Sequence, residues 1–86
     1  GVREMNEYAK ELGKVLESFD PDRFKGFIDK HKDMFKPFAL VILEGKDDDW
    51  ILGTMAKMVM NRTDMSGKDK ARAREILDRK GWDYRI

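Results

Sequence analysis

Three consecutive aspartates, Asp47 to Asp49, are the densest group of metal-ligating side chains in the sequence. Hard cations need several carboxylate oxygens that converge on one point, and an EF-hand loop has glycine at its sixth position and glutamate at its twelfth. Counted from Asp47, those positions hold Leu52 and Met58. Neighbouring side chains on a helix also point about 100° apart. The pattern therefore predicts the capped start of a helix, and we expect no metal site.

Catalytic side chains are scarce. His31 is the only histidine and the chain has no cysteine, so neither a histidine-rich metal site nor a thiolate nucleophile can form. Ser18 and Ser66 fall at expected helix ends, where capping explains them. We expect His31 to be a partly buried structural residue on an apolar helix face. The sequence thus predicts a protein that is not an enzyme and has no cofactor, metal ion or small-molecule substrate.

A methionine-rich segment with aromatic neighbours is the candidate partner-binding surface. Thioether side chains adapt to irregular partners, and aromatic residues are enriched at interfaces. The candidate residues are Trp50, Met55, Met58, Met60, Trp82 and Tyr84. They predict a helical protein-interaction module whose partner is another protein or a second copy of the chain. The same residue types also fill cores, and that alternative stays open.

The C-terminal segment, residues 66–86, is the basic part of the chain, with seven basic and four acidic residues. The cations that would contact phosphates are Lys68, Lys70, Arg72, Arg74, Arg79 and Arg85. Two aromatic residues in this segment could add stacking on bases. A nucleic-acid-binding domain is therefore the alternative function. Several of these cations also lie three or four residues from an acidic side chain, which is the spacing of ordinary surface ion pairs.

Helical periodicity predicts the elements that position these residues. The expected helices cover residues 3–18, 21–35, 37–44, 48–61 and 67–80, followed by an aromatic C-terminal tail. Asp20 and Pro21 are typical of a helix start. The apolar run 37–44 fits either a buried strand or a wholly buried helix, and we favour a helix because Pro37 suits its first turn and Gly45 a left-handed stop. The glycine inside the fourth helix, Gly53, indicates close approach by a neighbour.

Composition limits the protein class. The chain has 86 residues, of which 41% are hydrophobic and 41% charged, with a net charge of +1. This length predicts a single domain over 1–86, an all-α bundle closing on one core. The longest apolar run is far shorter than the roughly 20 residues of a membrane span, so we expect no membrane insertion. The absence of cysteine fits a reducing compartment, and we expect a cytoplasmic protein.

Overall fold

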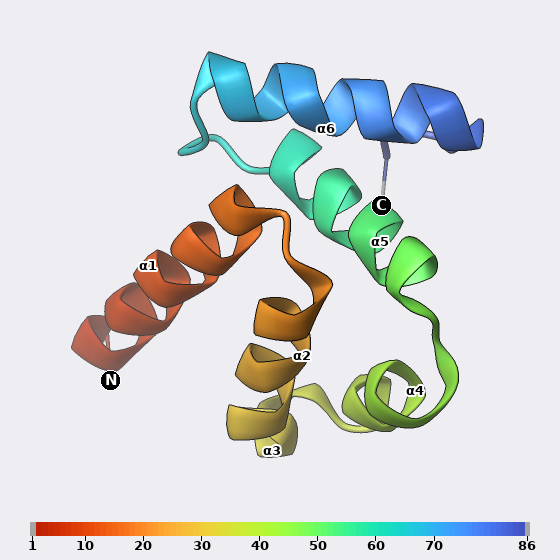
Figure 1. Ribbon diagram of the computed structural model, residues 1–86. Coiled ribbons are helices and arrows are strands. Elements are labelled where there is room, and N and C mark those ends of the chain that lie inside the picture. The colour runs from red at the N-terminus through yellow and green to blue at the C-terminus, as the bar shows by residue number, and fades with distance from the viewer. Residues whose placement is uncertain (1, 86) are drawn as a thin grey trace.

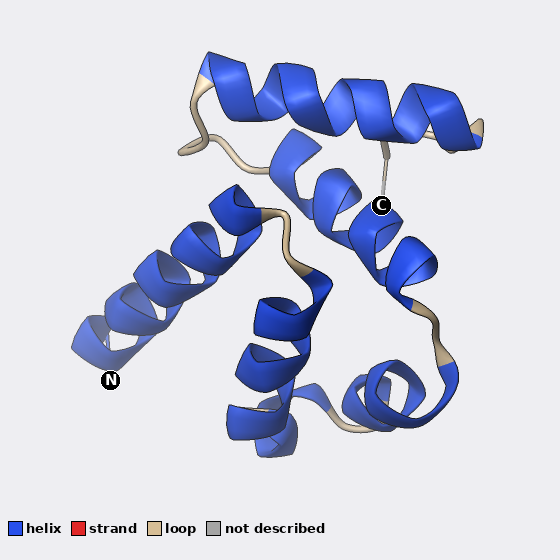
Figure 2. Ribbon diagram, in the orientation of Figure 1, coloured by secondary structure: helices blue, strands red, loops and turns tan. Residues whose placement is uncertain are grey.

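Six α-helices and their connecting turns make up the computed structural model, which describes residues 2–85 and the side chains of residues 6–85. The helices are α1 (Val2–Ser18), α2 (Pro21–Lys30), α3 (Lys32–Phe35), α4 (Phe38–Gly45), α5 (Asp48–Met60) and α6 (Gly67–Lys80). The described residues contain no strand (Figure 2). The predicted all-α class is confirmed, and the run 37–44 is a helix.

Local capping signals begin α2 and α6 and end α6 where the sequence predicts. The Asp20 side chain accepts a hydrogen bond from the N–H of Asp22 at 2.9 Å, and Ser66 accepts one from the N–H of Asp69 at 3.1 Å. Each bond satisfies an N–H group that has no partner within the first turn. Gly81 ends α6 with a positive φ of 70°, which a glycine adopts without steric cost.

Helix α5 is the centre of the fold. It packs most extensively against α6, which lies across it, and it also contacts α1 and α2 (Figure 1). The apolar residues of α5 therefore spread around much of its circumference. Helix α4 lies at the edge of the molecule and contacts mainly α2 and α3.

One hydrophobic core joins the helices, and only the single turn α3 has no fully buried residue in it, although its Phe35 packs against the core. Its buried members are Leu12, Leu16, Phe19, Phe24, Phe27, Ile28, Ala39, Ile42, Ile51, Met55, Ala56, Val59, Met65, Ala73, Ile76 and Leu77. No polar or charged residue is buried among residues 6–85. Apolar burial therefore supplies the main favourable term in folding.

The second predicted helix, 21–35, is interrupted at His31, so residues 2–85 form six helices instead of five. His31 has φ −114° and ψ 26°, which lies outside helical geometry, and α3 follows as a separate turn. After the break, the centroid of the Phe35 ring lies 6.2 Å from the centroid of the Phe27 ring and 6.0 Å from that of Tyr8. Packing of aromatic rings from different helices accompanies the break at His31. Helical periodicity alone cannot predict such a break.

Two details of the α4 ends also differ from expectation. Gly45 is the last residue of α4 and not a left-handed stop; the chain leaves the helix through Lys46 in an extended conformation. Pro37 is the N-cap residue, so the helix begins one position later than predicted. Only two residues separate α4 from α5, and an extended Lys46 connects them without a glycine turn.

Candidate interaction site

The three consecutive aspartates point to three different parts of the molecule. Asp47 caps α5, since its Oδ1 accepts a hydrogen bond from the N–H of Trp50 at 2.8 Å. Asp48 pairs with Lys25 of α2, with 2.7 Å between Oδ1 and Nζ. Within the described part of the chain, no group of three or more histidine, cysteine or acidic residues has the arrangement of a metal site.

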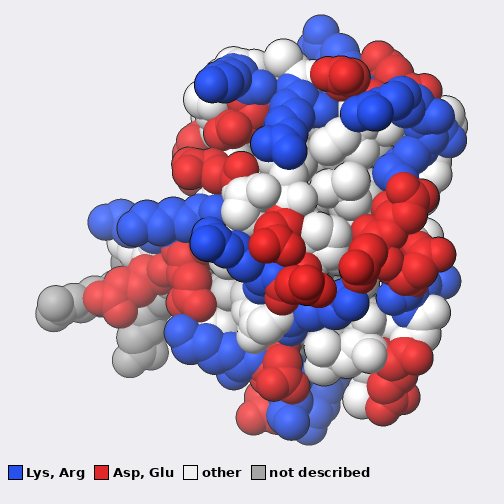
Figure 3. Space-filling model, in the orientation of Figure 1, with Lys and Arg blue, Asp and Glu red and all other residues white. Residues whose placement is uncertain are grey.

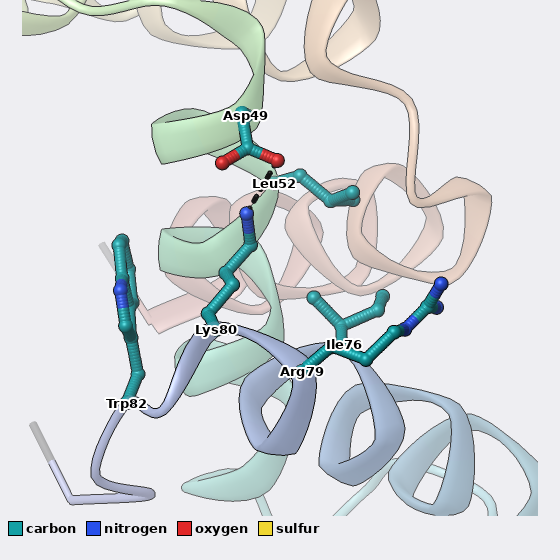
Figure 4. A pocket seen from close by; sticks show the side chains of 6 residues that line it. All are labelled: Asp49, Leu52, Ile76, Arg79, Lys80 and Trp82. Carbon is teal, nitrogen blue, oxygen red and sulfur yellow. Dashed lines mark ion pairs between the residues drawn. The ribbon is translucent and has the colours of Figure 1, made fainter.

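Asp49 forms the third contact, an ion pair with Lys80 at the end of α6, with 2.6 Å between Oδ1 and Nζ (Figure 4). The Lys80 side chain is only 11% exposed, so its stem packs on the protein while its ammonium group reaches α5. A pocket of about 410 Å³ surrounds this pair, lined by Asp49, Leu52, Ile76, Arg79, Lys80 and Trp82. Its Asp49 and Lys80 charges already neutralise each other.

Trp82 lies on Gly53 in the middle of α5. A Cβ atom at Gly53 would be 2.5 Å from Cζ3 of the indole, which confirms the predicted close approach. The Trp82 ring also meets Trp50 edge to face, with centroids 6.3 Å apart, and the Lys57 ammonium lies 5.7 Å from its centroid. The C-terminal tail therefore covers Trp50 from one side.

The six predicted partner-binding residues all pack on the hydrophobic core. Five of them are partly buried: Trp50, Met58, Met60, Trp82 and Tyr84. Met55 has 0% exposure and faces the centre of the core, so the expectation that it belongs to a partner-binding surface is wrong. Its position on the inner side of α5 between neighbouring helices is the reason.

Tyr84 fastens the tail to α5 and α6. Its hydroxyl donates a hydrogen bond to Asp78, and this bond, together with desolvation, raises the pKa of Tyr84. The Nδ2 group of Asn61 donates to the Tyr84 carbonyl oxygen at 2.8 Å. The Arg74 guanidinium lies 6.0 Å from the centroid of the tyrosine ring. These contacts give the aromatic tail a role within the monomer.

The predicted nucleic-acid contacts lie on α6 and in the tail, at Lys68, Lys70, Arg72, Arg74, Arg79 and Arg85. The Arg72 guanidinium carbon lies 4.6 Å from the centroid of the Phe19 ring. Arg79 forms an ion pair with Glu75, with 3.8 Å between Nη2 and Oε1, and Arg85 forms one with Asp83, with 3.5 Å between Nη2 and Oδ2. Basic and acidic side chains alternate over the visible face of the molecule (Figure 3). Binding to nucleic acid stays a prediction.

His31 lies among aromatic rings, 5.1 Å from Tyr8 and 4.7 Å from Phe27 between centroids. Its buried Nε2 has no hydrogen-bond partner among the described residues and is 3.7 Å from Glu11 Oε2. A hydrogen bond from Lys30 is the largest contribution that lowers the pKa of Glu11. The predicted partly buried position of His31 is confirmed.

Helix α4 exposes an apolar surface that the sequence prediction missed. Met34 of α3 is 64% exposed, Leu40 is 54% and Val41 is 45%, and two further large apolar side chains of α4 are also exposed. We call these residues the α4 surface: Met34, Phe38, Leu40, Val41 and Leu43. Only Ala39 and Ile42 of α4 are buried, so the expectation of a wholly buried helix is wrong.

A signal for this surface is present in the sequence. All six residues from Phe38 to Leu43 are apolar, and a helix buries such a run completely only when neighbours surround it. Because α4 lies at the edge of the bundle and packs mainly on α2 and α3, the described residues leave its outer side exposed.

A groove extends the α4 surface toward α5. It has a volume of about 520 Å³ and is lined by Met34, Phe35, Lys36, Phe38, Thr54, Lys57 and Met58. Met58, one of the predicted partner-binding residues, therefore borders the exposed apolar region. The Thr54 hydroxyl donates a hydrogen bond to the Trp50 carbonyl oxygen at 3.1 Å. The charged residues that line the groove are Lys36 and Lys57.

No protein-family model, curated protein or solved structure matches this chain. Among residues 2–85, no helix has both the length and the apolar character needed to cross a membrane. The surface geometry therefore carries the functional argument.

Proposed function

We propose that this protein is a small, non-enzymatic helical protein-interaction module and that the α4 surface is its contact surface. The single observation that carries the proposal is the exposure of five large apolar side chains between Met34 and Leu43, four of them on α4. Contiguous exposed apolar patches with polar rims mark interaction sites on soluble proteins.

The arrangement of charges supports the same surface. Helix α4 carries no basic residue, its only acidic residue is Glu44 near its end, and charged groups otherwise occur at its edges, at Lys36 and Lys46. Interfaces commonly have an apolar centre and a polar rim. The groove beside Met34 and Phe38 adds a concave region that an apolar side chain of a partner can enter.

The other candidate contact surfaces have fewer side chains free to bind a partner. The predicted partner-binding residues of α5 and the tail are largely engaged in packing on the core, and several α6 cations already contact acidic or aromatic groups. A partner at the α4 surface requires no rearrangement of these contacts. This supports an interface at α4 over one at the methionine-rich helix.

The test uses three immobilised baits: the parent protein, Leu40→Asp and the control Ala71→Asp, which adds the same charge at an exposed position of α6. Far-UV circular dichroism first establishes that all three are folded. We expect a protein, either another chain or this one, that the parent and Ala71→Asp retain and Leu40→Asp loses. The purified partner should then protect α4 amides from hydrogen exchange. Retention of the same proteins by all three baits contradicts the proposal.

A further inference from the structure

The outer side of α4 carries apolar side chains in its middle and an acidic side chain at its C-terminal end. Ala39 and Ile42 face the core, so at 100° per residue Leu40, Val41 and Glu44 project from the opposite side. Leu40 and Val41 occupy the middle of this face and Glu44 its C-terminal end. The face is thus apolar at its centre and negative at one end.

The opposite end of α4 is positive. Lys36 lies two residues before the helix, and its only ion-pair partner among the described residues is the highly exposed Asp33, at 3.3 Å. Such an exposed pair contributes little and exchanges readily. The Glu44 carboxylate has neither a hydrogen bond nor an ion pair within the described chain. Opposite charges therefore lie near the two ends of α4, a helix about 12 Å long, with the apolar residues between them.

We infer that α4 of one molecule packs antiparallel against α4 of a second copy across a two-fold axis. This inference rests on the proposed function and names the partner. Two-fold symmetry brings a surface patch against itself, so an antiparallel pair places Lys36 of each copy near Glu44 of the other. Leu40 and Val41 of the two copies then meet at the axis, and the helix dipoles run in opposite directions.

Glu44 favours a second copy over a membrane as the occupant. Insertion of this face into lipid would bury an ionised carboxylate next to Leu40 without a partner, which is costly. A second copy supplies Lys36 at the required end of the helix. The complementary charges lie at the two ends of one short helix, because Lys36 precedes α4 by two residues and Glu44 lies near its C-terminal end.

The exposed area limits the strength of this association. Five partly exposed side chains provide on the order of a few hundred Å² per copy, the size of the largest apolar patch on an ordinary monomer. A standard stable interface buries about 800 Å² on each partner. The dimer is therefore weak and reversible, with a dissociation constant on the order of 100 μM to 1 mM.

Charge reversal provides the sharpest test. Lys36→Glu places two glutamates opposite each other across the interface, and Glu44→Lys places two lysines there. Each variant alone should self-associate about tenfold more weakly than the parent, because like charges replace opposite ones. An equimolar mixture of the two variants pairs opposite charges at both ends of the interface, so it should form a heterodimer about as tightly as the parent dimerises. Sedimentation equilibrium over a wide range of concentrations measures all four samples.

Matched controls make the same charge changes elsewhere. Lys68→Glu on α6 and Glu17→Lys on α1 are exposed positions on helices without an extensive contact with α4. Each should dimerise like the parent, and their mixture should show no preference for a heterodimer. Leu40→Asp should be monomeric while keeping the far-UV circular dichroism spectrum of the parent.

The outcomes separate the inference from the proposed function. A parent that stays monomeric at millimolar concentration, or a mixture that associates no better than its components, overturns the antiparallel dimer. If a different protein is retained in a Leu40-dependent way by that monomer, the interaction module stands and only its partner is wrong. Leu40-dependent binding to vesicles of anionic phospholipid by a monomeric parent would likewise overturn the inference and identify a membrane as the occupant.

Discussion

The indole of Trp82 lies so close to Gly53 that a Cβ atom there would be 2.5 Å from Cζ3 and 2.7 Å from Cη2 of the ring. This contact joins the C-terminal tail to the middle of the central helix. It also explains why a residue with poor helix propensity occupies the interior of α5.

Gly53→Ala should destabilise the protein by about 1 to 3 kcal/mol, because the added methyl group must displace the Trp82 ring. Urea denaturation measures the change in the free energy of unfolding, and the tryptophan emission maximum reports the displaced indole. The natural control is Gly26→Ala, since nothing lies within 4 Å of a Cβ atom at that position in α2. It should stabilise by about 0.5 to 1 kcal/mol.

A double-mutant cycle tests whether the Trp82 ring causes the destabilisation by Gly53→Ala. Trp82→Ala removes the ring that a methyl group at Gly53 would meet, so Gly53→Ala should cost much less in that background than in the parent. Contacting residues couple in this way, whereas distant ones are additive. Equal effects in both backgrounds would show that the cost has another origin.

Asp47→Ala combined with Asp48→Ala should lower the free energy of unfolding by about 1 to 2 kcal/mol, mostly through loss of the Asp47 cap. Asp47→Ala alone should account for most of the loss. The Asp48 and Asp49 side chains are 63% and 83% exposed, and exposed ion pairs contribute little. Thermal melts with and without calcium or magnesium complete the test. A metal-dependent midpoint in the parent that disappears in the double variant would contradict the helix-start interpretation.

Arg62→Met should loosen the connection between α1 and the loop that follows α5. The Arg62 guanidinium donates to the Ala9 carbonyl oxygen at 3.1 Å and to both carboxylate oxygens of Asp64. Loss of the charged hydrogen bond to Ala9 should cost about 1 to 2 kcal/mol in unfolding free energy. Arg79→Met is the control, because its pair with Glu75 is largely exposed and should contribute little.

The contribution of the Arg62–Asp64 ion pair to stability depends on pH. The hydrogen bond from Arg62 lowers the pKa of Asp64 below its ordinary value of 3.8. A lowered folded-state pKa contributes stability above the ordinary value, and this contribution is lost as the pH falls through the folded-state pKa. An NMR titration of the Asp64 carboxyl carbon should give a lower pKa in the parent than in Arg62→Met. Equal values would mean that the pair does not persist in solution.

Binding to nucleic acid can be tested directly. We expect titrations of duplex and single-stranded DNA and RNA to show no binding that weakens steeply with added salt, because the net charge is only +1 and Arg72 and Arg79 already have partners. Salt-sensitive binding that is lost in Lys68→Ala with Lys70→Ala would favour the alternative function.

The sequence alone determined the helical class and most helix ends, because the responsible interactions join residues within a few positions of each other. The Asp20 and Ser66 caps and the Gly81 turn are such local interactions. The close approach at Gly53 was also predictable, although its partner was not, since a glycine inside a helix implies contact without naming the neighbour.

Only the tertiary structure decided which apolar residues are covered. A helical pattern shows that Met55 and Leu40 are apolar but does not show that one lies between helices and the other at the edge of the bundle. The break at His31 is likewise accompanied by contacts between separate helices, in which Tyr8 of α1 meets His31 and Phe35. We place the proposed interface on α4 because the described residues cover only one side of this helix. How many neighbours a helix has is a property of the packed fold and not of the local sequence.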